Sequence, residues 1–359
     1  MNIIHATTAH MRYDTRIFHR ECVNLAYEFS VSLYVADGRD DENTRMVRIR
    51  SVTRSENRAV KVFCMTKALF SASRSKSIIH LHDPELFPTA LLLKVFGFKV
   101  VVDIHEDFAK QIYLKHYLPK FFRPILSVTY RFIEKCVLHS VDFSVVCCSG
   151  FLDRKKSILV GNFITMKEAR SLKMANEPLT RKRRSFIYSG GLSNERGLFN
   201  LLMLAEKLKE RGINLIIAGN FDNEVSQAQA EQYDGWSNVE YLGYVEREKL
   251  LGIQKSCLAG VILFNNVGQY YLASSVKLSE YLACGLPVLM PEFGEWIELN
   301  KQFGLGRNTK VENVDIETID QLISYGDTFV FQKSAEKFLR EFSLDECIGE
   351  LSAKYRGLL

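Results

Sequence analysis

Apolar residues along the chain follow two spacings that alternate from the N-terminus onward. Short runs such as Asn2–Ala6 and Lys99–Ile104 are rich in β-branched residues, as expected for strands of a sheet. Between such runs the apolar residues recur every three or four positions. From Phe18 to Phe29 this spacing predicts a helix, which Asp14 or Thr15 caps. The alternation of strand and helix predicts a parallel sheet covered by helices on both faces.

This alternation runs twice along the 359 residues, a length that fits two domains of ordinary size. The first run covers residues 1–164. The stretch 165–184 is polar and ends in the basic run RKRR, so we predict a linker there. The second run covers 185–330, and the pattern of 331–359 predicts a helical tail. The sequence therefore predicts two doubly wound α/β domains with a cleft between them.

The overall composition narrows the class of protein. A hydrophobic fraction of 47% and a charged fraction of 25% are typical of a globular protein. The net charge of +5 suits an acidic ligand or an anionic membrane surface, but is too modest to indicate nucleic acid. The eight cysteines are scattered without a C-x-x-C pair, which favours reduced core residues of a cytoplasmic protein over disulfides or a zinc site.

We expect neither a signal peptide nor a membrane span. The apolar run in the first ten residues is too short for a signal peptide. The longest apolar stretch, 90–102, is interrupted by Lys94 and Gly97 and is too short to cross a bilayer.

Polar side chains gather where three predicted strands of the first domain end. Ligands of open α/β sheets bind beyond the carboxyl ends of the strands, so three such groups favour a site there. A single histidine after a strand is more often structural. For Asp83, capping of the helix that begins at Pro84 is an equally good role. The three groups are Asp14 with Arg16, His82 with Asp83, and His105 with Glu106 and Asp107.

In the second domain, a predicted strand runs into a loop that contains Gly190, Gly191 and Arg196. Glycines allow backbone N–H groups to approach a phosphate, and the following helix start adds its positive end. Arg196 adds a fixed cation with a planar donor fork. The signal is weak alone, since the loop lacks the spacing of G-x-G-x-x-G and of a P-loop.

Farther on, Lys277 and Glu280 lie three residues apart on a predicted helix that follows Ser275. One interpretation is an exposed ion pair. The other is a lysine that faces a diphosphate and a glutamate that accepts both hydroxyls of a ribose, since a carboxylate offers two oxygens.

Four stretches together resemble a glycosyltransferase of the GT-B fold, of the glycosyltransferase family 4 type. The stretches 188–202 and 274–289 would be weak alone, but the set of four is specific and spans most of the chain in the expected order. The stretches are YDTRIFHRECVNLA (13–26), HLHDPELFPTALLLKVFGFKVVVDIHEDF (80–108), YSGGLSNERGLFNLL (188–202) and SSVKLSEYLACGLPVL (274–289).

The resemblance implies a nucleotide-diphosphate-sugar donor, UDP- or GDP-linked, held mainly by the second domain, with no other cofactor. Arg196 and Lys277 would bind the diphosphate beside the glycine loop and Ser275, and Glu280 would bind the ribose. His105 would contact the donor sugar or its phosphate from across the cleft. The last helix would pack back toward the N-terminal domain.

The resemblance also implies retention of anomeric configuration without a metal ion. His105, Arg196 and Lys277 would then be the catalytic residues, with the two cations stabilising the charge of the leaving diphosphate. The family serves mostly the assembly of bacterial surface polysaccharides such as O-antigen or capsule, so we expect a lipid-linked glycan acceptor. The residues that we expect on the acceptor side are Asp14, Arg16, His82 and Glu106.

The sequence departs from the family pattern in ways that leave the donor sugar open. The acid usually found eight residues before Glu280 is replaced by Leu272. A second cation in the phosphate loop is missing, because Leu192 follows Gly191. The first domain is also compact, with little sequence between Asp37 and Ile78 for an acceptor-recognition insert.

The segment 113–135 mixes aromatics, leucines and cations. Such a face can lie on an anionic bilayer, which would place a cytoplasmic enzyme at the inner face of the cell membrane. An ordinary amphipathic core helix with snorkelling lysines fits the same pattern.

Two other functions fit the same fold. One is a sugar-nucleotide epimerase or hydrolase, which an assay for nucleoside diphosphate released without acceptor would distinguish. The other is an inactive GT-B subunit that supports a partner transferase. Leu272 favours this role, and the presence of His105, Arg196, Lys277 and Glu280 argues against it.

Overall fold

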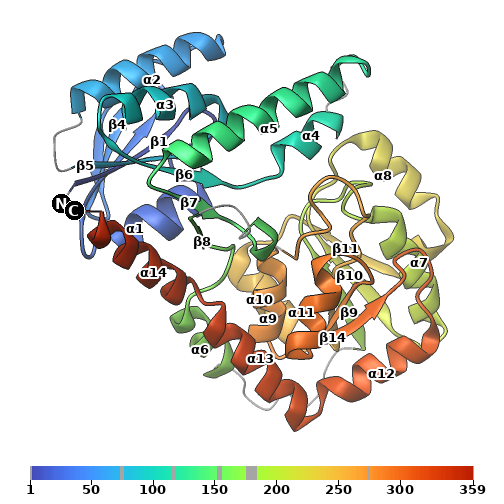
Figure 1. Cartoon of the computed structure of the whole chain (residues 1–359). Helices are drawn as coiled ribbons and strands as arrows, with labels where there is room; N and C mark the ends of the chain where they lie inside the picture. The colour runs from blue at the N-terminus through green and yellow to red at the C-terminus, as the bar shows by residue number, and fades with distance from the viewer. Residues whose placement is uncertain are drawn as a thin grey trace. The chain divides into compact units, whose positions relative to one another are not determined.

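The structure is a computed structural model that describes residues 2–72, 77–114, 118–151, 156–174, 184–273 and 275–358. Contacts divide the chain into two compact units (Figure 1). Unit 1 comprises Met1–Asn162 together with Leu344–Leu359, and unit 2 comprises Phe163–Ser343.

Among its described residues, unit 1 has an eight-stranded sheet of order β3-β4-β2-β1-β5-β6-β7-β8, in which only β3 is antiparallel to its neighbour. Val100, Val101 and Val102 of the central strand β6 have no exposed surface, as expected where helices cover both faces of a parallel sheet. The strands are β1 (Asn2–Thr7), β2 (Ser30–Val35), β3 (Glu42–Thr44), β4 (Val47–Ser51), β5 (Ser77–Leu81), β6 (Lys99–Ile104), β7 (Phe143–Val146) and β8 (Ser157–Leu159).

Helices pack on this sheet in two groups. Helix α3 contacts both α2 and α5, and α1 contacts α14 (Figure 1). The helical segments of unit 1 are η1 (Thr15–Cys22), α1 (Val23–Leu25), α2 (Arg58–Ala72), η2 (Pro84–Leu86), α3 (Phe87–Val95), α4 (Phe108–Leu114), α5 (Phe122–Ser140), η3 (Ser149–Phe151) and α14 (Leu344–Gly357).

The first helix differs from the prediction in its type. It begins as a π-helix, η1, and continues as the short α1. Of the two candidate caps, Asp14 is the one used, because its carboxylate accepts hydrogen bonds from the backbone N–H groups of Arg16 and Ile17.

The capping role predicted for Asp83 is wrong for its side chain. That carboxylate instead accepts hydrogen bonds from Thr7 and Thr8 in the loop after β1.

Unit 2 contains a six-stranded parallel sheet in its described part, of order β11-β10-β9-β12-β13-β14. The chain winds outward from β9 in one direction and resumes at β12 in the other, so the topological switch point lies between β9 and β12. The strands are β9 (Ser185–Ser189), β10 (Asn214–Ala218), β11 (Val239–Gly243), β12 (Ala259–Val261), β13 (Val288–Pro291) and β14 (Gly306–Thr309).

Helices surround this second sheet as well (Figure 1). They are α6 (Met166–Met174), α7 (Leu198–Lys209), α8 (Glu224–Glu231), η4 (Asp234–Asn238), α9 (Arg247–Ser256), α10 (Val276–Ala283), α11 (Glu295–Phe303), α12 (Ile316–Gly326) and α13 (Phe329–Glu341).

The predicted linker and the predicted tail both contribute helices to the two units. The stretch 165–184 contains helix α6, whose Ala169 and Leu172 belong to the core of unit 2. Its polar residues mask this buried face in the sequence. The tail 331–359 divides at Ser343, since α13 belongs to unit 2 and α14 to unit 1.

Candidate active site

A two-glycine turn follows β9 at the switch point of unit 2. A Cβ atom on Gly190 would lie 2.6 Å from Cε and 2.8 Å from Nζ of Lys277, and Gly190 has a φ of +136°. A Cβ atom on Gly191 would lie 2.8 Å from Nη1 of Arg196. The φ of Gly190 favours glycine at that position, and the turn lies close to the ends of two cationic side chains. The sequence prediction that these four residues gather is consistent with this geometry.

Lys277 lies in the first turn of α10, with its ammonium over two aromatic rings. Nζ is 5.3 Å from the ring centre of Tyr188 and 5.1 Å from that of Phe264. Burial, and then the charge of Arg196, lower the pKa of Lys277 to about 8. Among the described residues no carboxylate forms an ion pair with this ammonium. An unpaired cation in a desolvated place is costly, and an anion bound there would offset the cost.

Arg196 lies on the other side of the turn and also has no carboxylate partner among the described side chains. Its Nε donates a hydrogen bond to the hydroxyl of Tyr270 at 3.3 Å. The hydroxyl of Tyr188 donates to the carbonyl of Gly191 at 2.9 Å and so holds the turn. Two unpaired cations at a glycine turn beyond the strand ends make an anion site, at the position where doubly wound sheets bind ligands.

Glu280 does not form the exposed ion pair with Lys277 that was one of the two interpretations. It is buried, and its Oε1 accepts hydrogen bonds at 3.2 Å from both Nε and Nη2 of Arg247. Nη1 of Arg247 reaches Glu168 at 2.8 Å. Arg247 was missed by the sequence analysis, because nothing in its local sequence links it to α10. Ser275 is the N-cap residue of α10, and its side chain makes no capping hydrogen bond.

Leu272, which replaces the usual acid of the family, is buried in the segment before α10. The carboxylate of Glu295, at the start of α11, reaches the same segment and accepts a hydrogen bond from the N–H of Ala273 at 3.1 Å. Glu295 was not among the predicted site residues. It lies after Glu280 in sequence, whereas the family pattern places its acid before that residue.

In unit 1, three of the predicted residues converge on Asp103 at the end of β6. Nη2 of Arg16 donates hydrogen bonds to both carboxylate oxygens of Asp103, at 2.9 Å and 3.1 Å. Nη1 of Arg16 donates to the carbonyl oxygen of Val160 at 2.6 Å. His82 Nδ1 and His105 Nε2 each lie 3.2 Å from Oδ2 of Asp103. Burial acts to raise the pKa of Asp103, but the charge of Arg16 and the hydrogen bond from His82 hold it well below its usual range. Asp103 itself was noticed in the sequence only as the end of a strand.

His105 lies just past β6, where its side chain is 17% exposed. Its ring stacks on that of His10 at 5.3 Å between ring centres. Burial lowers the pKa of His105 to about 3, against the opposing effect of Asp103, so the imidazole is neutral at ordinary pH. A neutral ring of this kind can donate one hydrogen bond and accept another.

The residues predicted for the acceptor side lie in different environments. Asp14 caps η1, and Glu106 is exposed after β6. Arg16 and His82 are buried, with His82 fully enclosed, and both are paired with Asp103. This burial favours a positioning role for Arg16 and His82 over direct contact with an acceptor.

Comparison with known proteins bears on both the fold and the activity. Residues 170–338, which lie within unit 2, match the family model described as "Glycosyl transferases group 1". No curated protein sequence matches the chain. The family match supports a sugar-transfer enzyme, and the matched range contains Gly190, Arg196, Lys277 and Glu280.

Solved structures with the same fold cover almost the whole chain. Sucrose-phosphate synthase of Thermosynechococcus elongatus has a TM-score of 0.69 at 14% identity, with 99% of this chain and 98% of that chain covered. The UDP-forming α,α-trehalose-phosphate synthase of Burkholderia xenovorans, in complex with glucose-6-phosphate, gives 0.70 at 12% identity, with 99% of each chain covered. HepE of Anabaena, in complex with UDP, gives 0.68 at 10% identity, with 99% and 100% covered.

This chain has the GT-B fold. The prediction of two doubly wound, Rossmann-like α/β domains is thereby confirmed. At these identities the structural likeness shows the fold alone, so the donor, the acceptor and the stereochemistry are matters of proposal.

Proposed function

We propose that the chain is a retaining glycosyltransferase that moves a sugar from a nucleotide-diphosphate sugar to a glycan acceptor. One observation carries the proposal: Arg196 and Lys277 flank the Gly190–Gly191 turn without a carboxylate partner among the described residues. A bound diphosphate would supply the negative charge that these two cations lack as a partner. UDP is the first candidate for the nucleotide, because structural neighbours are described as UDP-forming or UDP-bound.

The same two cations provide the chemistry of the leaving group. As the bond between sugar and phosphate breaks, negative charge grows on the diphosphate. Fixed donors at such a position are each worth roughly 3–4 kcal/mol of transition-state stabilisation. Lys277 and Arg196 would take the part that a divalent cation has in other sugar transferases, so the transfer needs no metal ion. We propose front-side attack by the acceptor, with the leaving phosphate as its base.

Glu280 and His105 have separate roles in this proposal. Arg247 fixes one carboxylate oxygen of Glu280, which orients the group to accept the ribose hydroxyls with the other. His105 contacts the donor sugar or its phosphate as a neutral imidazole. Oδ2 of Asp103 lies 3.2 Å from Nε2 of His105.

An exposed surface of apolar and basic side chains on α4 and α5 supports the further proposal of a lipid-linked acceptor and a place in surface-polysaccharide assembly. No helix in the described part of the chain is long and apolar enough to cross a bilayer. Yet α5 exposes apolar side chains at helical spacing, including Phe122, Ile125 and Phe132, and Arg131 and Lys135 are exposed beside them. This mixture suits the interface of an anionic bilayer. Residues 115–117 of the predicted segment lie outside the described residues.

Salt-sensitive binding to vesicles tests this surface. The protein should sediment with anionic vesicles at low salt and be released as salt rises. A Phe122→Ser/Phe132→Ser variant should stay in the supernatant. Equal sedimentation of the variant and the wild type would contradict the assignment.

A thermal-shift screen tests the donor site. UDP-, GDP-, dTDP- and ADP-sugars are compared, since a ligand at 100 times its Kd adds about 2.7 kcal/mol to the stability of the folded chain. Lys277→Ala should lose the shift, whereas Lys301→Ala should keep it, because Lys301 is exposed on α11 and paired with Glu298. A full shift in Lys277→Ala would remove the assignment of the donor site.

One observation favours a second function, that of a GT-B subunit which binds a nucleotide sugar without transferring it. Leu272 is buried where the family has an acid. Such a subunit would show the thermal shift with UDP-sugars but no release of nucleoside diphosphate with any acceptor or membrane extract. The transferase proposal predicts release that depends on the acceptor.

A further inference from the structure

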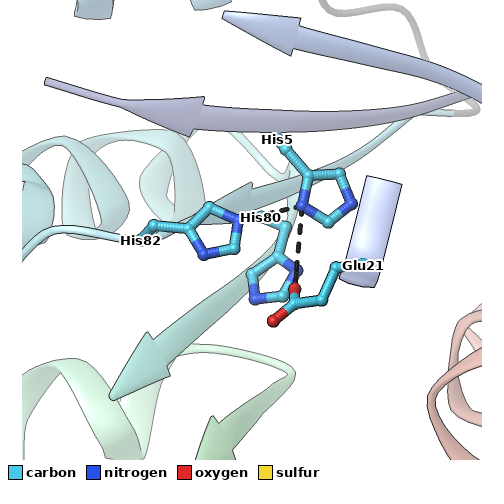
Figure 2. Close-up of side chains that lie close together, drawn as sticks. All are labelled: His5, Glu21, His80 and His82. Carbon is cyan, nitrogen blue, oxygen red and sulfur yellow. Dashed lines mark hydrogen bonds and ion pairs between the residues drawn. The ribbon is translucent and has the colours of Figure 1, made fainter. Parts of the chain in front are cut away.

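Three histidines and a glutamate meet inside unit 1, apart from the donor site (Figure 2). His5 of β1 and His80 of β5 are cross-strand partners in register. His82 is two residues beyond His80, so it points to the same face of the sheet. Glu21 approaches from η1. All four side chains are buried, with no exposed surface.

The polar atoms of this cluster lack the partners that buried groups normally have. In the described part of the chain, neither carboxylate oxygen of Glu21 has a hydrogen-bond partner, nor do the Nε2 atoms of His5 and His80. Nε of Arg16 lies 3.5 Å from Glu21 and offsets its charge in part. Burial, and then the nearby Asp103 charge, raise the pKa of Glu21. A buried carboxyl group in this position either holds a proton or binds a cation.

The distances within the cluster are near those between ligands of a single ion, although not equal to them. Each residue offers one ligand atom, and the four atoms lie within 4.8 Å of one another. His5 Nδ1 is 2.9 Å from His82 Nε2 and 4.0 Å from Glu21, and His80 Nδ1 is 3.8 Å from Glu21. Ligands at 2.0–2.1 Å around a tetrahedral ion are about 3.3 Å apart, so small side-chain rotations suffice.

A second layer of residues orients the imidazoles as in known metal sites. His82 Nδ1 lies 3.2 Å from Asp103, which selects the tautomer whose Nε2 lone pair faces His5. The hydroxyl of Tyr355, on α14, lies 2.7 Å from Nδ1 of His80, the same nitrogen that faces Glu21, so an ion bound at that nitrogen would displace this contact. A carboxylate that holds the outer nitrogen of a metal-bound histidine is a common feature of such sites. Burial also lowers the pKa values of His5 and His80, which leaves them neutral and able to act as ligands.

We propose that His5, Glu21, His80 and His82 form a buried structural site for a divalent transition metal ion, with Zn²⁺ the best match. Three neutral imidazoles and one carboxylate are a ligand set that suits Zn²⁺. The four ligands complete a tetrahedron and leave no position for a substrate, so the ion would hold β1, β5 and η1 together. His82, Asp103 and His105 also lie close enough for an ion, but Asp103 is already paired with Arg16. The proposal goes beyond the proposed function and does not depend on it.

Metal analysis of the full-length protein, free of any histidine tag, tests the proposal. We expect close to one equivalent of zinc after purification without chelator. After removal of the metal, added Zn²⁺ should raise the melting temperature by several degrees, and added Co²⁺ should give the visible absorption bands of a tetrahedral site. Metal below about a tenth of an equivalent, together with no response to either ion, would overturn the site.

Substitution of two proposed ligands and of one nearby histidine tests which residues bind the ion. Glu21→Gln and His80→Gln should each lose the equivalent of metal and the cobalt spectrum. His19→Gln should keep both, since His19 is exposed on the same helix as Glu21. Retention of a full equivalent in Glu21→Gln and His80→Gln would place the ion elsewhere and overturn the assignment.

If either variant fails to fold, the wild-type cobalt spectrum decides alone, since absence of tetrahedral bands rejects the site. Binding of UDP to unit 2 should be the same with and without the ion, so this test is separate from that of the transferase.

Discussion

The two units have the same doubly wound architecture but treat charge at their strand ends in opposite ways. In unit 1, the buried guanidinium of Arg16 is paired with Asp103, and the imidazoles of His82 and His105 lie against the same carboxylate. In unit 2, Arg196 and Lys277 lie against a glycine turn and have no carboxylate partner among the described residues. Paired charges make a rigid interior, and unpaired charges make a place for a ligand. This difference is the reason why we propose the donor site in unit 2.

The largest expected effect concerns His105, the one member of the unit 1 network with partly exposed surface. His105→Ala should lower kcat by roughly 10²–10⁴-fold, the range for loss of a catalytic hydrogen bond or proton contact. Donor KM should change little, because the nucleotide is held by unit 2. Steady-state kinetics measure both. His139→Ala, an exposed histidine at the end of α5, is the control. Full turnover with only a lower melting temperature would show that His105 is a structural residue.

The second effect tests the pairing inside unit 1. Asp103→Ala leaves the buried guanidinium of Arg16 without its carboxylate, which should cost about 3–5 kcal/mol in the free energy of unfolding. Denaturant unfolding measures this cost. Asp320→Ala breaks an exposed pair with Arg211 and should change stability little. Equal losses in the two variants would contradict the contrast between buried and exposed pairs.

The third effect is a pH dependence specific to unit 2. A bound diphosphate favours the charged form of Lys277, whose pKa in the free protein is lowered to about 8 by burial. Affinity for UDP should therefore be full below pH 8 and fall by up to about tenfold per unit as the pH rises above it. Burial raises the pKa of Tyr188, so that residue does not titrate in this range. Calorimetric titrations from pH 7 to pH 9.5 measure the slope.

Lys277→Arg is the matched variant for this pH dependence, because arginine stays protonated throughout the range. Its affinity should not vary between pH 7 and pH 9.5. A slope in this variant equal to that of the wild type would assign the titration to another group.

The last prediction is that metal ions have no effect on the binding of UDP. The affinity of the chain for UDP should be the same in EDTA, in Mg²⁺ and in Mn²⁺, because the cations of the donor site are side chains. Binding, rather than turnover, is the informative measurement, since it is independent of any ion inside unit 1. Affinity that disappears in EDTA and returns with Mn²⁺ would show that the donor site needs a metal.

Local sequence was sufficient to predict much of the fold and to single out the residues that we propose for the donor site. The valines of β6, the Gly190–Gly191 turn and the helix after Ser275 are each encoded within a few neighbouring residues. The sequence predicts a helix, strand or turn when the residues of that element alone carry the hydrophobic or glycine pattern that forms it. The buried Ala169 and Leu172 of α6 were hidden by the polar residues around them.

The partners of the site residues could not be predicted in the same way. Arg247 is 33 positions from Glu280, and Arg16 is 87 positions from Asp103. Such pairs exist only once the sheet order is known, and no local signal distinguishes them from other charged residues. The histidine cluster shows the same limit, because its ligands come from three separate segments.

The return of α14 to unit 1 has a consequence for the order in which the protein can mature. Unit 1 is discontinuous in sequence, and Tyr355, which lies fully buried against His80, follows the whole of unit 2 along the chain. During synthesis on the ribosome, the first sheet therefore emerges early but lacks helix α14 until the whole of unit 2 has been synthesised. Unit 2 is the first part of the molecule able to finish folding, although it is encoded second. A nascent chain that ends near residue 343 should accordingly protect unit 2 from protease while unit 1 is still cleaved.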